Sequence, residues 1–169
     1  MTDWDSVLTD ELTSEFLKLI TDCRDIGSYD FDRMIGKKVD TNVVLHVFSD
    51  ASALAYGACV YLHQPDLFQS LRLIKDKVKI CSNGDISIPK LELAATVVGV
   101  HLYESLINFD DLFRNATVYF WTDSMAALRW IQGVKQWPPF VENRVTIIRK
   151  LGLVSSFRYI NTEANPADL

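Results

Sequence analysis

The sequence predicts an α/β domain preceded by a short helical segment. Three strand-like runs follow one another between residues 43 and 82. A long helical pattern comes next, and strands and helices then alternate to the end. This order is typical of a sheet with packed helices, and 169 residues suit one domain with an appendage. We expect residues 1–40 to form a helical connection or linker and residues 41–169 to form the domain.

The appendage carries apolar residues at helical spacing, followed by a polar stretch. Residues 27–38 include two glycines and two adjacent lysines, which predict a linker. The apolar residues that predict the helix are Val7, Leu8, Leu12, Phe16, Leu19 and Ile20.

Three strands are expected first in the domain. Residues 43–50 form a nearly unbroken apolar run, typical of a central strand buried on both faces. A second strand is expected at 56–63 and a more polar third strand at about 71–82. In the third strand, lysines at 75, 77 and 79 alternate with other residues. This pattern predicts an outer strand protected from edge pairing, with a track for substrate phosphates as the alternative.

The later elements begin with a helix opened by Pro89, which we expect to reach about Asn108. Its small residues, Ala94, Ala95 and Gly99, would let it approach a sheet closely. The remaining expectations are a strand at 117–121, a short helix capped by Asp123-Ser124 and ending at Gly133, a helix from Pro138-Pro139 to Leu151-Gly152, a strand at 155–160, and a loop at 162–169 that begins to turn into a helix.

Four acidic residues lie at the edges of these expected elements. Asp50 closes the first strand, Glu92 falls in the first turn of the long helix, Asp123 closes the fourth strand, and Asp168 ends an Asn-Pro-Ala-Asp segment. Taken singly, each could be a turn, cap or helix-start residue. Adjacent first and fourth strands would place Asp50 and Asp123 side by side, with Glu92 leaning over the same edge. Converging carboxylates are costly unless divalent cations neutralise them, so the pattern predicts a metal site.

Composition limits the other possibilities. The net charge of −5 counts against a free-standing, tight nucleic-acid binder, but less against a domain whose carboxylates are masked by metal or that a larger polypeptide holds to its substrate. No apolar run is long enough to span a membrane, and the acidic start lacks a signal core. We therefore expect an intracellular protein that is not secreted and has no membrane partner.

Several motifs surround the four acidic residues. They are Phe48-Ser49-Asp50-Ala51-Ser52 with Ala55-Tyr56-Gly57-Ala58, Ile88-Pro89-Lys90-Leu91-Glu92-Leu93, Trp121-Thr122-Asp123-Ser124 and Asn161-Thr162-Glu163-Ala164-Asn165-Pro166-Ala167-Asp168-Leu169. Together these motifs resemble the ribonuclease H domain of Bel/Pao-type retrotransposon polyproteins. The segments Trp130-Ile131-Gln132-Gly133, Lys135-Gln136-Trp137 and Phe140-Val141-Glu142-Asn143-Arg144-Val145 extend the similarity, and Trp4-Asp5 with Leu8 resembles the connection after the reverse transcriptase.

The resemblance implies a ribonuclease H-like fold. Its five-stranded mixed sheet would have strands one to three antiparallel, strands four and five added in parallel, and flanking helices. It also implies hydrolysis of the RNA strand of RNA–DNA hybrids with two Mg²⁺ or Mn²⁺ ions, and a reverse transcriptase domain of the same polyprotein as a partner. By residue matching, Asp50 would bridge both ions, Glu92 and Asp123 would hold one, and Asp168 would hold the other.

Two departures from the family pattern favour an alternative function. The loop at 161–165 lacks the histidine found in many ribonucleases H, and Glu163 could partly take its place. The chain ends one residue after Asp168, so we expect a truncated last helix. The alternative is a catalytically weak or inactive ribonuclease H-like scaffold or protein-interaction domain. An integrase-like nuclease fits less well because of the Asn-Pro-Ala-Asp ending, and an aspartyl phosphatase because position 52 is serine.

Candidate substrate contacts complete the predicted site. Ser52 and Ser124 follow candidate metal ligands closely and could bond phosphate or sugar. Lys90, Arg144 and Arg158 are possible contacts to the nucleic-acid backbone. Trp121, Trp130 and Trp137 could stack on bases or pack in the core.

Overall fold

The computed structural model describes residues 7–25, 42–65, 71–81 and 86–168. The chain forms two compact units, residues 1–33 and 34–169. The first unit contains helix α1 (Asp10–Asp25), in the segment where helical spacing was predicted. The predicted linker at 27–38 and the Trp4-Asp5 motif lie outside the described residues. In the part of the chain that is described, no helix combines the length and the apolar composition needed to cross a bilayer.

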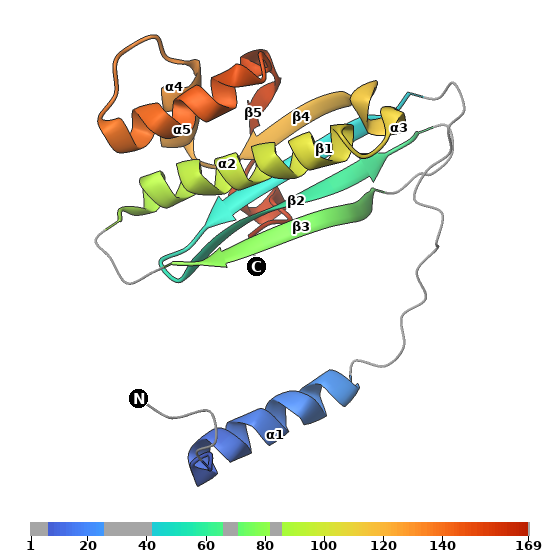
Figure 1. Ribbon diagram of the computed structural model, residues 1–169, viewed down its shortest axis with the longest axis vertical. Coiled ribbons are helices and arrows are strands. Elements are labelled where there is room, and N and C mark those ends of the chain that lie inside the picture. Colours follow the sequence, from blue (N-terminus) through green and yellow to red (C-terminus); the bar gives the residue numbers. More distant parts are fainter. Residues whose placement is uncertain (1–6, 26–41, 66–70, 82–85, 169) are drawn as a thin grey trace. The chain divides into compact units, whose positions relative to one another are not determined.

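Five strands form the sheet of the second unit: β1 (Val44–Ala51), β2 (Ala55–His63), β3 (Arg72–Ile80), β4 (Thr117–Thr122) and β5 (Phe157–Tyr159). Their order is β3-β2-β1-β4-β5 (Figure 1). β1 pairs antiparallel with β2, as does β2 with β3, whereas β1 with β4 and β4 with β5 are parallel. This confirms the predicted five-stranded mixed sheet, and β3 lies at its edge.

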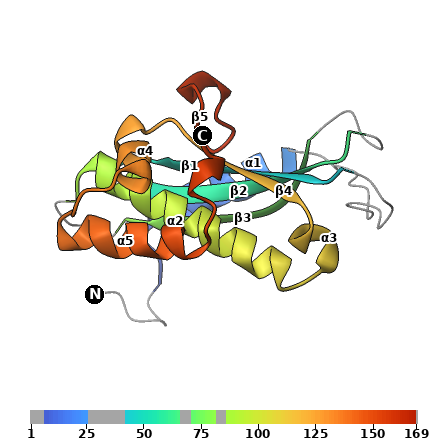
Figure 2. The same cartoon turned by 90° about the horizontal axis from the view of Figure 1, so that it is seen from above.

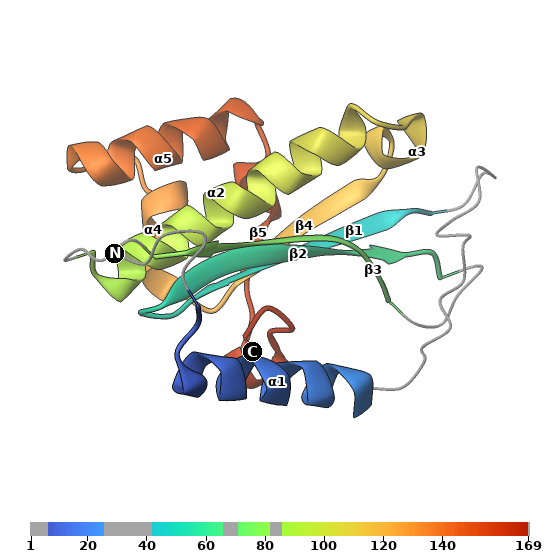
Figure 3. The same cartoon turned by 60° about the horizontal axis from the view of Figure 1, so that its bottom comes forward.

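Helices α2 and α5 lie together on one face of the sheet, and the segment after β5 lies on the opposite face (Figures 2 and 3). The short helix α3 was not predicted. It is capped by Asp110, whose side chain accepts a hydrogen bond from the Leu112 N–H, but four residues give no periodic pattern to detect. The elements of this group are α2 (Ile88–Ile107), α3 (Asp111–Arg114), α4 (Met125–Gln132), α5 (Pro139–Lys150) and the 3-10 turns η1 (Val154–Ser156) and η2 (Thr162–Ala164).

The opposite face of the sheet is aromatic. The ring of His46 stacks with those of Tyr119 and Trp121, with centroids 6.0 Å away in each case. The Trp121 Nε1–H donates to His46 Nδ1 over 3.1 Å. Trp130 and Trp137 are partly buried against the main core. Trp130 and Trp137 therefore pack against the core, and Trp121 contacts His46 on the aromatic face. Stacking of these three tryptophans on bases remains a prediction.

The close approach of α2 to the sheet fixes the height of the helix above β1. A Cβ atom added at Gly99 would lie 2.8 Å from Val47 Cγ1 and 3.4 Å from Ala58 Cβ. Val47 is 1% exposed and belongs to the main apolar core. Glycine is therefore required here for packing, and this contact helps to set the position of everything that α2 carries.

We predict that Gly99→Val lowers the free energy of unfolding by about 1–3 kcal/mol, because the added carbons overpack the contact with β1. His101→Val is the matched control, since it places the same side chain at an exposed position of the same helix. Urea unfolding followed by circular dichroism measures both. Equal stability of the two variants would show that α2 does not need this close approach.

Candidate metal centre

Three of the four predicted acidic residues come together. Asp50, Glu92 and Asp123 each offer a carboxylate oxygen, and these oxygens lie within 4.8 Å of one another. The pairing of β1 with β4 explains the meeting of the two aspartates. Phe48 is opposite Trp121 in the parallel register, so Asp50 and Asp123 each lie two residues beyond a paired position. We call these three residues the acidic triad.

Glu92 is the most deeply buried member of the triad, at 8% exposure. α2 begins at Ile88, and its first turn contains no acidic residue, so the prediction that Glu92 lies in the first turn was wrong by a small margin. Burial raises the pKa of Glu92 to about 8, and the charges of Asp50 and Asp123 add to the effect. Burial also raises the pKa of Asp50, with a further contribution from Asp123.

The donor set fits a divalent cation. Among the described residues, Glu92 Oε2 is buried and has no hydrogen-bond partner. A buried carboxylate oxygen without a partner is costly, and here it lies beside two further carboxylates. Magnesium prefers such oxygen ligands and needs few protein groups. The acidic triad could therefore hold a divalent cation, which would compensate both the missing hydrogen bond and the mutual repulsion.

Asp123 is oriented by a residue that the sequence did not single out. The Thr162 Oγ1–H donates to Asp123 Oδ2 over 2.6 Å, from the loop that follows β5. The cap of α4 is Ser124, whose Oγ accepts a hydrogen bond from the Ala127 N–H over 3.2 Å. The expected shared cap at positions 123 and 124 is thus a serine cap alone, which leaves the Asp123 carboxylate available.

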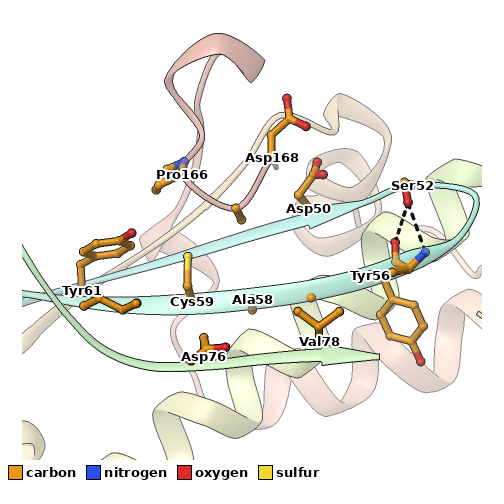
Figure 4. A pocket seen from close by; sticks show the side chains of 14 residues that line it. Asp50, Ser52, Tyr56, Ala58, Cys59, Tyr61, Asp76, Val78, Pro166 and Asp168 are labelled. Atoms are coloured by element: carbon orange, nitrogen blue, oxygen red, sulfur yellow. Dashed lines mark hydrogen bonds between the residues drawn. The ribbon is translucent and has the colours of Figure 1, made fainter. Parts of the chain in front are cut away.

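Asp168 is not a member of the acidic triad, and its side chain is exposed. Its negative charge nevertheless contributes to the raised pKa values of Asp50 and Glu92. Asp50 and Asp168 both line a pocket of about 290 Å³ between the aromatic face of the sheet and the segment after β5 (Figure 4). The role of Asp168 as a metal ligand remains a prediction.

Asn165 fixes the segment that carries Asp168. Its side chain is 4% exposed. The Nδ2–H donates to the Ser49 carbonyl over 3.2 Å, and Oδ1 accepts from the Ala167 N–H over 3.2 Å. Ser49 directly precedes Asp50, so this side chain ties the segment to β1 beside the triad. Both Asn165 and Thr162 lie in the Asn161–Leu169 motif, and an asparagine before proline is a turn signal. The motif does not indicate the contact of Thr162 with Asp123.

The two serines named as candidate substrate contacts already have local partners. Ser52 Oγ accepts hydrogen bonds from the Leu54 and Ala55 N–H groups, each over 3.2 Å, within the turn between β1 and β2. Ser124 caps α4. Their contact with substrate remains a prediction.

Lys90 and Arg158, two of the three candidate basic contacts, lie near aromatic rings. Lys90 Nζ is 5.6 Å from the ring centroid of Phe140. The Arg158 guanidinium carbon is 5.8 Å from the Tyr119 ring, on an exposed residue of β5. Their contact with substrate also remains a prediction.

Comparison with known proteins agrees with the geometry. A family model described as "Pao retrotransposon-like RNaseH-like domain" matches residues 1–124. The search of curated protein sequences gave no match. Among solved structures, the chain is similar to LC11-RNase H1, isolated from compost and solved with an RNA/DNA hybrid. The two are 18% identical with a TM-score of 0.50, over 74% of this chain and 89% of that one.

Two further solved structures match the chain with lower scores. The RNase H domain of rv2228c from Mycobacterium tuberculosis is 13% identical over 75% of this chain and 86% of that chain, with a TM-score of 0.49. The prototype foamy virus protease-reverse transcriptase is 10% identical over 79% of this chain and 19% of that chain, with a TM-score of 0.44. The similarity to LC11-RNase H1 supports the ribonuclease H-like fold.

We predict that the metal-free protein loses stability as the pH rises from about 5 to about 8. The folded-state pKa of Glu92, about 8, lies above its ordinary 4.5. Between these values the folded state keeps a proton that the unfolded chain has lost, so the free energy of unfolding falls with increasing pH. Glu92→Gln removes this titration. In EDTA, the free energy of unfolding of this variant should exceed that of the wild type by roughly 1–3 kcal/mol at pH 8 and by much less at pH 5.

Urea unfolding at three pH values in this range measures the effect. Glu163→Gln, at an exposed glutamate of the turn η2, is the control and should follow the wild-type profile. Parallel pH profiles for wild type and Glu92→Gln would contradict the burial of an unneutralised carboxylate.

We also predict that Asn165→Ala loosens the segment after β5, because the Ser49 carbonyl and the Ala167 N–H lose their partner. Hydrogen exchange of residues 161–168 should accelerate by roughly tenfold or more, while exchange in β1 changes little. Asn161→Ala is the control, since Asn161 is an exposed asparagine of the same segment. Unchanged exchange in the Asn165 variant would show that this side chain does not hold the segment.

Proposed function

Because the chain belongs to the family of Pao retrotransposon-like RNaseH-like domains, we propose that it is a metal-dependent endonuclease that hydrolyses the RNA strand of RNA–DNA hybrids. The observation that carries this proposal is the acidic triad, with three carboxylate oxygens within 4.8 Å of one another. Glu92 Oε2 is buried and, within the described part of the chain, has no hydrogen-bond partner, which a purely structural cluster does not explain. The similar fold of LC11-RNase H1, which was solved with an RNA/DNA hybrid, supports the choice of substrate.

We assign two roles to these side chains: four would bind metal, and two others position these ligands. When bound, two divalent cations, Mg²⁺ or Mn²⁺, would activate a water molecule and stabilise the leaving oxygen of an in-line displacement at phosphorus. We assign Asp50 to both ions, Glu92 and Asp123 to one, and Asp168 to the other. Thr162 orients Asp123 through its 2.6 Å hydrogen bond, and Asn165 keeps the segment bearing Asp168 beside β1. No side chain has to act as a nucleophile.

Substrate recognition would depend on the shape and the backbone of the hybrid. A ribonuclease that cuts without sequence preference recognises phosphates and 2′-hydroxyl groups rather than base edges. Ser52, Ser124, Lys90 and Arg158 are our candidates for these contacts. Since two of them follow members of the triad by one or two residues, they could bond the sugar or phosphate next to the cleaved linkage.

A larger polypeptide would help to hold the substrate. The net charge of −5 opposes tight binding of a polyanion by this chain alone. We propose that residues 1–40 connect the nuclease domain, residues 41–169, to a reverse transcriptase domain of the same polyprotein, which would deliver the hybrid.

The second candidate is an inactive or weakly active scaffold of the same fold. It is favoured by the position of Asp168 outside the triad and by the loop without histidine. A calorimetric titration with Mg²⁺ or Mn²⁺, paired with a hybrid-cleavage assay, separates the two functions. Cleavage above a metal-free control would eliminate the scaffold.

We predict that Asp50→Asn reduces hybrid cleavage by at least about 100-fold, because it removes the central charged ligand of the site. The fold should persist, since the substitution also removes a like charge from the triad, and circular dichroism with thermal unfolding checks this. The matched control is Asp76→Asn, an acidic residue that lines the same pocket outside the triad. Mg²⁺-dependent cleavage retained by Asp50→Asn would reject the assignment.

A further inference from the structure

A basic and aromatic cluster lies apart from the acidic triad, and its components are Tyr56 on β2, Lys90 on α2, and Phe140 and Arg144 on α5. We propose that Arg144, supported by Phe140 and Lys90, binds a backbone phosphate of the nucleic acid. This deepens the proposed function, on which it rests, by naming a second contact with the hybrid at a distance from the cleaved linkage. We call these four residues the Arg144 cluster.

The guanidinium of Arg144 is held in one orientation before any ligand arrives. Its central carbon lies 3.4 Å from the centroid of the Phe140 ring. Nη1 donates to the Phe140 carbonyl over 3.0 Å, one turn back along α5. Stacking on an aromatic ring together with a hydrogen bond restricts the long side chain, so that little conformational entropy remains to be lost on binding. The remaining N–H groups of the planar fork suit the paired oxygens of a phosphate.

Arg144 also has no counter-ion among the described residues. Its side chain is partly buried, and this burial lowers its pKa from the ordinary value, while the nearby Tyr56 acts in the opposite direction. Within the described ranges, the ion pairs join His101 with Glu104 and Arg114 with Asp111, and none involves Arg144 or Lys90. A partly buried cation without an anionic partner is unfavourable, and a bound phosphate would remove that penalty.

Glu142, the acidic residue of the first turn of α5, does not act as a counter-ion for Arg144. Its Oε2 accepts a hydrogen bond from the Trp137 N–H over 3.1 Å, in the loop before the helix. The carboxylate therefore stabilises that loop.

Lys90 makes the case for an anion stronger. Its Nζ lies 5.6 Å from the centroid of the same Phe140 ring that Arg144 covers. Two cations sharing one ring repel each other, and a bound anion would compensate this repulsion. A guanidinium fork and a point-like ammonium together match the several oxygens of a phosphodiester.

The cluster lies at the end of the sheet that bears the triad. The beginnings of α2 and α5 lie side by side at that end of the domain (Figures 1 and 3). Lys90 precedes Glu92 by two residues on α2, and because successive helical residues are about 100° apart, the two side chains leave the helix in different directions. The Arg144 cluster is thus a neighbour of the metal centre rather than a part of it, as a contact to a more distant phosphate requires.

The test compares wild type with Arg144→Gln in hybrid cleavage and hybrid binding. We expect KM to rise roughly tenfold with kcat within about twofold, and the slope of log K against log salt concentration to fall by about one, as for the loss of one phosphate contact. Lys150→Gln removes a charge at the opposite end of α5 and should leave both quantities unchanged. Arg144→Lys, which keeps the charge but not the fork, should be intermediate.

The outcomes distinguish the cluster from the proposed function. Binding is also measured with Asp50→Asn as background, so the cluster can be tested even without cleavage. A wild type that binds hybrid without cutting it contradicts the nuclease, and the salt slope of Arg144→Gln still decides the cluster. If the wild type cleaves hybrid and Arg144→Gln has an unchanged salt slope, only the proposal for the Arg144 cluster is overturned. A lowered Tm of Arg144→Gln with unaltered KM and salt slope has the same meaning. A wild type that binds no hybrid overturns both.

Discussion

The parallel pairing of β1 with β4 is the interaction on which the site depends. Its register sets Phe48 opposite Trp121, and therefore carries Asp50 and Asp123 out of neighbouring strands at the same level. Because successive side chains of a strand point to opposite faces, a slip of one residue would turn one aspartate away from the other. The close packing of Gly99 on Val47 then fixes α2 over the same strands and brings Glu92 to meet both carboxylates.

This arrangement places three carboxylates close together, and one of them, Glu92, is buried. Glu92 responds by holding a proton more tightly, because its burial and the two aspartates both disfavour the charged form. The surrounding structure holds the acids in place through neutral groups: Thr162 bonds Asp123, and Asn165 bonds the strand beside Asp50. Such a site is poised for a ligand of opposite charge. The Arg144 cluster has the opposite charge and, in the part of the chain that the structure describes, holds a preorganised cation without an anion. The two sites together match a metal ion and a polyanionic backbone.

Local patterns predicted much of this from the sequence. Apolar runs and turn residues located all five strands and the main helices to within a few residues, because burial and turn chemistry act over short stretches of chain. Acidic residues at the edges of the expected strands and helix indicated three side chains that do meet. The pattern failed where the signal was short or depended on distant partners: α3 spans four residues, and Thr162 acquires its role from a carboxylate 39 positions away.

The sequence by itself determined the class of fold, the candidate ligands and their chemical preference, since these follow from periodicity, residue type and the resemblance to a known family. Only the tertiary structure decided that Asp168 lies outside the triad. It also decided that, among the described residues, Glu92 has a buried oxygen without a partner and Arg144 is stacked without a counter-ion. The physical reason is that desolvation and Coulomb interaction depend on distance in space. The distance between two residues that are far apart in the sequence is undefined until strand register and helix packing set it.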